Sequence, residues 1–396
     1  MKVLYASFDV VPAPKGATTH IARFVEALVG QYGSVDLMTL GPSPSRPESR
    51  FYGARHLRVC PPSTHYLDQA SCFRSAVDEQ LRAEPYDIVH FRCIWAGLPA
   101  IAAAPRLGFR TVYEANGFPS IELPYHFPGL ARRPDLLARL SEQEAECLQR
   151  ADAVVVPSDV TRAYAISRGA PEGHVRTIRN GVDPELFRPV HRDIEPGGRV
   201  RLLYVGTLAP WQGVGLLVDA FARACRHADL ELVLLAPNKG QWARPLLKRI
   251  AKLGVAERVR LLPPRSLAGV PAAVAAADIC LAPLANTRRN RVQGCCPIKV
   301  PEYLACERAV VAAGLPVVRE VLTHGETAWL YRAGDARSLR NAIVTLAGDP
   351  ALRARLGAAG RDMVCRRLTW RAAQTRLIEL YEGLRALGTR GPRAAR

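Results

Sequence analysis

The 396-residue sequence contains no uninterrupted apolar stretch long enough to cross a bilayer. A membrane-spanning helix needs about 18 or more consecutive apolar residues, and the best candidate, residues 270–285, includes Asp278. The opening residues MKVLYASFDV hold too short an apolar run for a secretory signal, and Asp9 interrupts it. We therefore expect a cytoplasmic protein that does not span a membrane.

Cysteine pairs with metal or redox spacing are also missing, although the chain has ten cysteines. Cys295 and Cys296 are adjacent, no second pair follows at a zinc-finger spacing, and no CxxC occurs. Most other cysteines lie inside apolar runs, which favours reduced thiols packed in a core. We predict no metal ligands in this chain.

Acidic residues are scarce relative to basic ones, with 36 Asp and Glu against 54 Lys and Arg, for a formal charge of +18. Such a charge can attract nucleic acid, anionic lipid or phosphorylated small molecules. The basic residues are spread along the whole chain, and no RNA-binding motif or basic–aromatic platform is present. Nucleic acid is therefore not an expected partner, whereas a solvated surface and an anionic ligand both stay open.

Continuous Val, Ile and Leu runs alternate with helical segments along the chain. This pattern is typical of parallel strands buried on both faces, and it predicts a doubly wound α/β fold. A segment rich in Pro, Gly and charge, residues 180–200, interrupts the alternation, which then restarts. We predict two tandem Rossmann-like domains with these bounds: domain one 1–185, linker 186–200, domain two 201–366, C-terminal helix 367–387 and basic tail 388–396.

Polar residues follow the strands of the first domain, where doubly wound sheets bind ligands. In PAPKGATTHIARFVEAL (12–28), a strand leads through a Lys-Gly loop into a helix whose N-terminus could bind an anion or sugar hydroxyls. Glu114 and Asn116 end another strand and are predicted to point into the same region. An ordinary capped turn and a surface loop remain the alternatives at these two places.

Two loops of the second domain also suggest ligand binding. In VGTLAPWQGVGLL (205–217) the glycine spacing is not that of a dinucleotide fingerprint, so a simple glycine-rich turn stays open. In QGCCPIKVPEYLACE, Lys299 can supply charge to a phosphate, and Glu302 can accept two hydrogen bonds from a ribose diol. The second loop therefore favours a nucleotide over a metal.

The order and spacing of seven segments resemble a known enzyme family. They are KGATTHI, IRNGVDPELFRP, LLYVGTLAPWQGVGLLVDAF, AAADICLAPL, PIKVPEYLACERAVVA, VREVLTHGETAWLYRAGD and the closing LTW helix. Over nearly its full length the chain resembles the retaining GT-B glycosyltransferases of family 4, which use nucleotide-sugar donors. The resemblance implies two Rossmann-like domains facing a cleft, with the C-terminal helix crossing back to the first domain. The first domain would bind the acceptor and the second the nucleotide diphosphate.

The resemblance assigns expected roles to individual residues. Expected donor-binding residues are Gly206, Thr207, Gln212, Arg265, Cys295, Cys296, Pro297, Ile298, Lys299 and Glu302. Expected acceptor-binding residues are Gly16, Ala17, Thr18, His20, Glu114, Asn116 and Asn180. Expected catalytic residues are Glu114, Lys299 and Glu302.

The chain departs from the family pattern at four of its functional positions. Thr207 and Gln212 stand where many members have an Arg and a Lys that neutralise the diphosphate. Gly294 replaces the first glutamate of a paired motif, and Glu114 stands where many members have a histidine. The diphosphate charge must then be met elsewhere, by Lys299 first, with the other candidates being Arg265, Arg289 and Arg291.

The implied reaction is sugar transfer to an acceptor hydroxyl with retention of configuration. No metal and no cofactor beyond the nucleotide-sugar co-substrate are expected, because no DxD-type motif lies at a cleft loop. The acceptor would be a sugar, a lipid or a small natural product. Residues 118–140 mix aromatics and arginines, as a peripheral membrane contact at the inner membrane face or a lid would. The alternatives are a nucleotide-sugar epimerase and a catalytically degenerate protein that binds nucleotide sugars or anionic membranes.

Overall fold

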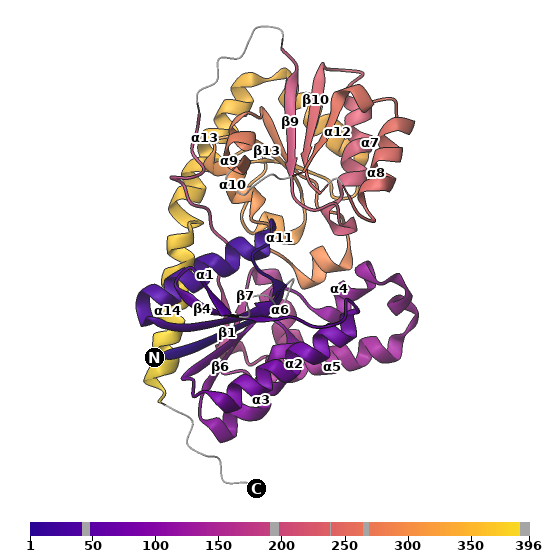
Figure 1. Cartoon of the computed structure of the whole chain (residues 1–396). Coiled ribbons are helices and arrows are strands. Elements are labelled where there is room, and N and C mark those ends of the chain that lie inside the picture. The colour runs from indigo at the N-terminus through magenta and orange to yellow at the C-terminus, as the bar shows by residue number, and fades with distance from the viewer. Residues whose placement is uncertain (42–47, 191–197, 238, 264–268, 389–396) are drawn as a thin grey trace. The chain divides into compact units, whose positions relative to one another are not determined.

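The computed structural model describes residues 1–41, 48–190, 198–237, 239–263 and 269–388 (Figure 1). The chain forms two compact units, each a parallel α/β sheet layered between helices. The first unit comprises Met1–Arg179 and the C-terminal segment from Ala373, and the second comprises Asn180–Ala372. The predicted fold class, two successive doubly wound α/β units, is confirmed.

The first unit contains an eight-stranded sheet in the order β3-β4-β2-β1-β5-β6-β7-β8. All neighbours are parallel except β3 and β4, which form an antiparallel edge hairpin. Apolar runs buried on both faces explain the central strands: β5 is wholly buried, and β1 is buried from Val3 to Ser7. The strands are β1 Lys2–Val10, β2 Ser34–Leu40, β3 Glu48–Phe51, β4 Ala54–Val59, β5 Ile88–Phe91, β6 Arg110–Glu114, β7 Ala153–Val156 and β8 Val175–Thr177.

Helices cover both faces of the first sheet. Helices α2, α3 and α5 pack together on one face, while α1 and the C-terminal α14 contact each other on the other (Figure 1). The helices are α1 Gly16–Tyr32, α2 Tyr66–Ala83, α3 Ile94–Leu107, α4 Pro119–His126, α5 Pro134–Arg150, α6 Asp159–Ser167 and α14 Trp370–Ala386, with short 3-10 turns at η1 Pro128–Arg132 and η2 Glu172–His174. The carboxyl ends of the strands β1, β5 and β6 lie between the two layers of helices.

The second unit contains a six-stranded, all-parallel sheet in the order β11-β10-β9-β12-β13-β14. Helices α7, α8 and α12 cover one face, and α9, α10 and α13 cover the other (Figure 1). The strands are β9 Val200–Val205, β10 Leu230–Leu235, β11 Val259–Leu262, β12 Ile279–Ala282, β13 Ala309–Ala313 and β14 Trp329–Tyr331. The helices are α7 Val214–Ala224, α8 Ala243–Lys252, α9 Gly269–Ala275, α10 Lys299–Ala305, α11 Pro316–Arg319, α12 Ala336–Gly348 and α13 Pro350–Arg367, with short turns at η3 Pro210–Gln212, η4 Ala256–Arg258 and η5 Arg289–Gln293.

The chain enters the second unit directly after Arg179. Val182 donates its backbone N–H to Leu368 and bridges to Thr369, which ties this segment to the end of α13. A Cβ at Gly181 would lie 2.2 Å from the Thr369 carbonyl carbon, so only glycine allows this close approach. The structure therefore divides the chain some residues before the predicted linker at 186–200, of which residues 191–197 lie outside the described residues.

Among the described residues, no helix is both long enough and apolar enough to cross a membrane.

Candidate functional site

The ammonium group of Lys299 lies inside the second unit and contacts neutral groups. Its Nζ donates to Gln212 Oε1 at 2.8 Å and lies 4.1 Å from the centroid of the Tyr204 ring. Lys299 is only 8% exposed. No carboxylate in the described part of the chain forms an ion pair with it. A buried cation without an anionic partner is costly in a ligand-free protein, so this arrangement suits the binding of an anion.

The carboxyl end of β9 shapes the space beside Lys299. Gly206 has φ +141°, and a Cβ there would lie 2.8 Å from Lys299 Nζ and 3.1 Å from Tyr204 Oη. Glycine therefore keeps a face of the ammonium open. The Tyr204 hydroxyl donates to the Thr207 carbonyl and lies 3.3 Å from Gln212 Oε1. The fold thus brings together Lys299 and the three predicted residues of the glycine-rich loop, Gly206, Thr207 and Gln212.

Glu302 lies one turn after Lys299 on α10. Its carboxylate accepts no hydrogen bond from any group that the structure describes. Burial raises the pKa of Glu302 to about 8, with the nearby Lys299 opposing the rise. Burial also lowers the pKa of Lys299 to about 7. Near neutral pH Glu302 is therefore mainly uncharged and Lys299 is only partly protonated, so a bound ligand can bring out the full charge of both groups.

A short π-helical turn, η5, precedes the cysteine pair and is fixed by Asn290. The Asn290 amide, fully buried, donates to the carbonyls of Trp211 at 2.7 Å and Ala285 at 2.9 Å. The Arg289 guanidinium lies 5.0 Å from the centroid of the Trp211 ring. These contacts hold η5 against the loop that also carries Gln212, so the two donor loops expected from the sequence form one structure.

The segment after η5 turns at Gly294, which has φ +81°. Cys295 and Cys296 follow and are partly exposed, and α10 begins only at Lys299, two residues after Pro297. Asn180 Nδ2 donates to the Cys296 carbonyl at 2.6 Å. The first residue of the second unit therefore holds the backbone of this segment.

Five side-chain donors surround the carboxylate of Glu114 in the first unit, and this residue is only 1% exposed. They come from β1, α1, the end of β5 and the loop after β6: Tyr5, His20, His90, Arg92 and Asn116. Tyr5 Oη donates to Oε2 at 2.6 Å, and Arg92 Nε donates to Oε1 at 2.7 Å. The Nε2 atoms of His90 and His20 lie 3.0 Å from Oε2 and 2.8 Å from Oε1. Both carboxylate oxygens are therefore fully used inside the protein.

The charge of Glu114 is stabilised by its neighbours despite its burial. Burial alone would raise the pKa of Glu114, but the adjacent Arg92 and His20 outweigh that effect and hold the pKa well below its usual range. Burial lowers the pKa of His90, whose Nδ1 lies 2.8 Å from Tyr381 Oη on α14. The Glu114 cluster thus links three strands and two helices of the first unit around one ionised carboxylate.

The Glu114 cluster extends through Arg92 toward the loop before α1. Arg92 Nη1 lies 3.2 Å from Asp9 Oδ2, and Lys15 Nζ lies 3.4 Å from Asp9 Oδ1. In this loop the Thr18 hydroxyl accepts the N–H of Ala13 at 3.0 Å. Gly16 is exposed at the start of α1, and Ala17 is partly buried beside it. The first turn of α1 is therefore held in place with Gly16 open to solvent.

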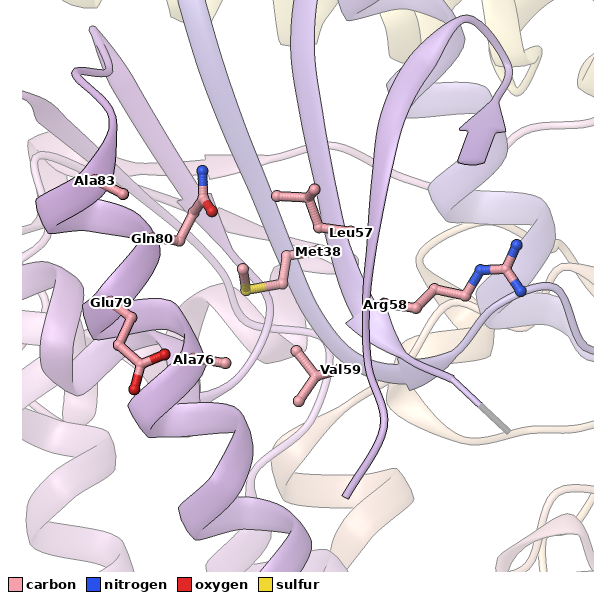
Figure 2. Close-up of a pocket in the computed structure, with 8 residues that line it drawn as sticks. All are labelled: Met38, Leu57, Arg58, Val59, Ala76, Glu79, Gln80 and Ala83. Atoms are coloured by element: carbon pink, nitrogen blue, oxygen red, sulfur yellow. The ribbon is translucent and has the colours of Figure 1, made fainter. Parts of the chain in front are cut away.

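A pocket of about 290 Å³ in the first unit lies apart from these groups (Figure 2). Figure 2 shows the side chains of Met38 from β2 and of Leu57 and Val59 from β4 facing α2, with Arg58 and Glu79 at opposite ends. None of the residues expected at the active site lines it. No group of three or more His, Cys, Asp or Glu residues within the described ranges is placed to hold a metal ion.

Two family models together match most of the chain. The model described as "Glycosyltransferase Family 4" matches residues 14–186, and the model described as "Glycosyl transferases group 1" matches residues 199–349. These two matches fall on the two structural units in order. The chain belongs to the family 4 glycosyltransferases.

Named relatives agree with this assignment, and solved structures share the fold. The glycosyltransferase is 28% identical to a D-inositol 3-phosphate glycosyltransferase of Thermomonospora curvata, over 81% of this chain and 77% of that one. It is 26% identical to the phosphatidyl-myo-inositol mannosyltransferase of Mycobacterium leprae, over 97% and 96% of the two chains. Its fold is similar to that of a sucrose-phosphate synthase of Thermosynechococcus elongatus, with TM-score 0.82, 21% identity and coverage of 98% and 100%. HepE of Anabaena, solved with UDP-glucose, gives TM-score 0.74 at 18% identity, covering 97% and 100%.

Seven of the sequence-predicted residues of the glycosyltransferase form two groups, one in each unit, and two others belong to neither group. Gly206, Thr207, Gln212 and Lys299 meet in the second unit, and His20, Glu114 and Asn116 meet in the first. Asn180, expected at the acceptor site, belongs to the second unit, where its side chain donates to the Cys296 carbonyl. Arg265 lies outside the described residues.

Sequence reasoning missed several residues that build the site of the glycosyltransferase. Tyr204 lies under Lys299, and Arg92 and His90 hold Glu114. A signal for the last two was present, because His and Arg are unusual within the otherwise apolar strand DIVHFRC and imply buried partners. Tyr204 gave no signal, since a tyrosine in a buried strand is ordinary.

Proposed function

We propose that this glycosyltransferase moves a sugar from a nucleotide-diphosphate sugar to an acceptor hydroxyl, with retention of configuration and without a metal ion. The observation that carries the proposal is the Lys299 ammonium, buried against neutral groups beside the open face at Gly206. When the glycosidic bond breaks, negative charge grows on the diphosphate leaving group. A preorganised cation at that position stabilises the transition state more than the ground state.

The donor roles follow from the two groups on α10. Lys299 Nζ contacts the diphosphate, and the Glu302 carboxylate accepts hydrogen bonds from the ribose hydroxyls. The HepE structures with UDP and with UDP-glucose support a nucleotide-sugar donor for a protein of this fold. Gln212 and Tyr204 orient the lysine, since both contact it directly. Cys295 and Cys296 are small residues of the loop that leads to Lys299 and take no chemical part.

Retention is proposed through attack on the same face from which the diphosphate leaves. A covalent intermediate would need a free carboxylate nucleophile, and both oxygens of Glu114 are occupied by donors. Glu114 is therefore assigned as a positioning residue that fixes His20 and Asn116, rather than as the catalytic group expected from the sequence. Lys299 supplies positive charge where a divalent cation would otherwise be needed.

A cyclic polyol, free or carried by a lipid, is the proposed acceptor. Relatives named for D-inositol 3-phosphate and for phosphatidyl-myo-inositol support it. A membrane-bound acceptor is favoured by the segment after α4, where Phe127 is 43% exposed and is followed by the exposed Arg132 and Arg139. Sedimentation with vesicles of neutral lipid and of neutral plus anionic lipid tests this: binding that needs anionic lipid supports a membrane acceptor, and none favours a free polyol.

The transfer assay tests the proposal as a whole. Purified enzyme is incubated with UDP-glucose, UDP-N-acetylglucosamine or GDP-mannose and with inositol phosphate or phosphatidylinositol, and products are identified by mass spectrometry. We expect product with one donor, unchanged by EDTA, and an anomeric configuration by NMR that matches the donor. Lys299→Ala and Glu302→Ala are each expected to abolish transfer while keeping the fold, and near-normal turnover by either would refute the donor-site assignment. Interconversion of the donor sugar without transfer would instead indicate an epimerase.

A further inference from the structure

The surroundings of Lys299 bear on its protonation before the donor binds. The ammonium is 8% exposed, and its contacts are an amide oxygen and an aromatic ring. These neutral groups replace little of the hydration that a charged amine loses on burial, so the free enzyme favours the neutral amine. A diphosphate placed on the open face at Gly206 would reverse this preference, because a nearby anion favours the protonated form.

Three other titratable groups face Lys299 from the elements packed around it. Tyr204 on β9 stays neutral, because burial raises its pKa. Cys295 precedes α10, and its charged form would favour a protonated lysine. Glu302 lies one turn further along α10, and its ionised carboxylate would also favour a protonated Lys299. Gln212 on η3 is neutral at every pH.

We infer that Lys299 takes up a proton when the diphosphate of the donor binds, so that the substrate supplies the counter-ion and solvent supplies the proton. The step balances: the amine nitrogen accepts H⁺ from the buffer and becomes an ammonium against the phosphate oxygens. This inference rests on the proposed function, since it needs a diphosphate at this position. If Lys299 takes up a proton on binding, the affinity for the donor depends on pH through Lys299.

Glu302 moves a proton in the opposite direction. To accept hydrogen bonds from a ribose diol its carboxyl group must be ionised, and burial holds its pKa at about 8 in the free enzyme. Binding therefore releases the proton that Glu302 still carries. At pH 8 a lysine of pKa about 7 is about 0.9 unprotonated and the carboxyl group is about half ionised. The enzyme should then take up about 0.4 proton net per nucleotide.

Isothermal titration calorimetry measures this number directly. UDP, GDP and ADP are titrated into the full-length enzyme at pH 8 in HEPES and in Tris, whose ionisation enthalpies differ. The dependence of the observed heat on the buffer gives the protons exchanged. Phosphate buffer is avoided because it would compete for the anion site. A nucleoside diphosphate is almost fully ionised at pH 8, so the change in the number of bound protons belongs to groups of the protein and not to the nucleotide.

Two substitutions separate the proton that Lys299 takes up from the proton that Glu302 releases. Glu302→Gln introduces an amide that can still bind the ribose but cannot release a proton. Net uptake should therefore rise to about 0.9 proton. Lys299→Met removes the uptake and should leave a net release of about 0.5 proton. Should Lys299→Met bind too weakly, Lys299→Arg serves the same purpose, because an arginine is already charged at pH 8. Lys248→Met, on the exposed face of α8, is the control and should match the wild type. Cys295→Ser tests separately whether the thiol beside Lys299 exchanges the proton.

The outcomes distinguish the inference from the proposed function. Binding by Glu302→Gln with no buffer dependence would mean that Lys299 is already protonated in the free enzyme, which overturns the inference and leaves the proposed function standing. A changed uptake in Cys295→Ser would assign the proton to the thiol and equally overturn it. Failure of UDP, GDP and ADP to bind the wild type would refute the nucleotide-binding site itself, and the inference with it.

Discussion

Glu114 in the first unit and Lys299 in the second are both buried, ionisable residues, yet their surroundings differ sharply. Glu114 has five donors on two oxygens, including a guanidinium. Lys299 has one amide oxygen and one aromatic ring. The first charge is compensated within the protein, and the second is not.

The difference shows how to tell a structural charge from a binding charge. A compensated ion organises its neighbours, and a ligand could reach it only by displacing one of its five donors. An uncompensated ion lowers the stability of the free protein, and a bound ligand of opposite charge offsets that penalty. Glu114 therefore positions residues of the first unit, while Lys299 binds the diphosphate. The predictions below test this contrast in order of expected effect.

Removal of Glu114 should have the largest effect on stability. Glu114→Ala leaves Arg92 and the other donors buried without their common acceptor, and we expect a loss of about 3–5 kcal/mol in the free energy of unfolding. Urea unfolding measures it. Glu146→Ala is the control, because the side chain of this residue on α5 is 45% exposed and forms a surface ion pair with Arg150. It should stay within about 0.5 kcal/mol of the wild type, and an equal loss in both variants would contradict a special role for Glu114.

Removal of Lys299 should change stability in the opposite direction. Lys299→Met replaces an uncompensated amine with an apolar chain of similar length, and we expect a gain of about 1–4 kcal/mol at pH 7. Donor binding should fall at least about 100-fold, because the diphosphate loses its cation. Urea unfolding and calorimetry on the same preparation check both parts. A loss of stability would show that the protein already compensates Lys299.

The stability gain of Lys299→Met should depend on pH. The folded-state pKa of Lys299 is lowered to about 7, whereas an unfolded lysine titrates near 10.4. Between these values the unfolded wild type binds the extra proton, so wild-type stability rises with pH. The gap between the variant and the wild type should therefore narrow by about 2 kcal/mol from pH 7 to pH 9. Parallel unfolding curves at pH 7, 8 and 9 measure it, and a constant gap would rule out a lowered pKa.

Loss of the Tyr204 hydroxyl should have the smallest effect. Tyr204→Phe keeps the ring under Lys299 and removes the hydrogen bond to the Thr207 carbonyl, which should cost about 1 kcal/mol of stability. Donor affinity should fall by less than tenfold, because Gln212 still holds the lysine. Tyr52→Phe, at a 53% exposed position, provides the comparison and should be neutral. Loss of donor binding in Tyr204→Phe equal to that in Lys299→Met would show that Tyr204 contacts the donor directly.

The sheets were largely predictable from sequence, and their edges were not. Buried parallel strands such as β5 and β13 carry continuous apolar runs that read directly as strands. The hairpin β3–β4 (ESRF and ARHLRV) at the edge of the first sheet carries no such run, so the sequence gives no strand signal there. The short β14 was missed for its length alone, since three residues give no measurable period.

The site was predictable where one segment carries it and not where distant segments meet. Lys299 and Glu302 lie in one motif, so their partnership could be anticipated. Gln212 meets Lys299 across 87 residues, and only the fold shows that the amide touches the ammonium. The family resemblance suggested Glu114 as catalytic, because it stands where many members have a histidine. Its donors from β1, α1 and β5 became visible only when the strands were paired.

The measurement that tests the contrast between Glu114 and Lys299 most directly is the melting temperature of the wild type and Lys299→Met at pH 7, each with and without UDP, GDP and ADP. A ligand that binds only the native state raises the melting temperature. Without nucleotide, we expect Lys299→Met to have a higher melting temperature than the wild type. We expect one nucleotide to raise the melting temperature of the wild type and not that of the variant. A variant that melts lower and still responds to that nucleotide would contradict an uncompensated, donor-binding lysine.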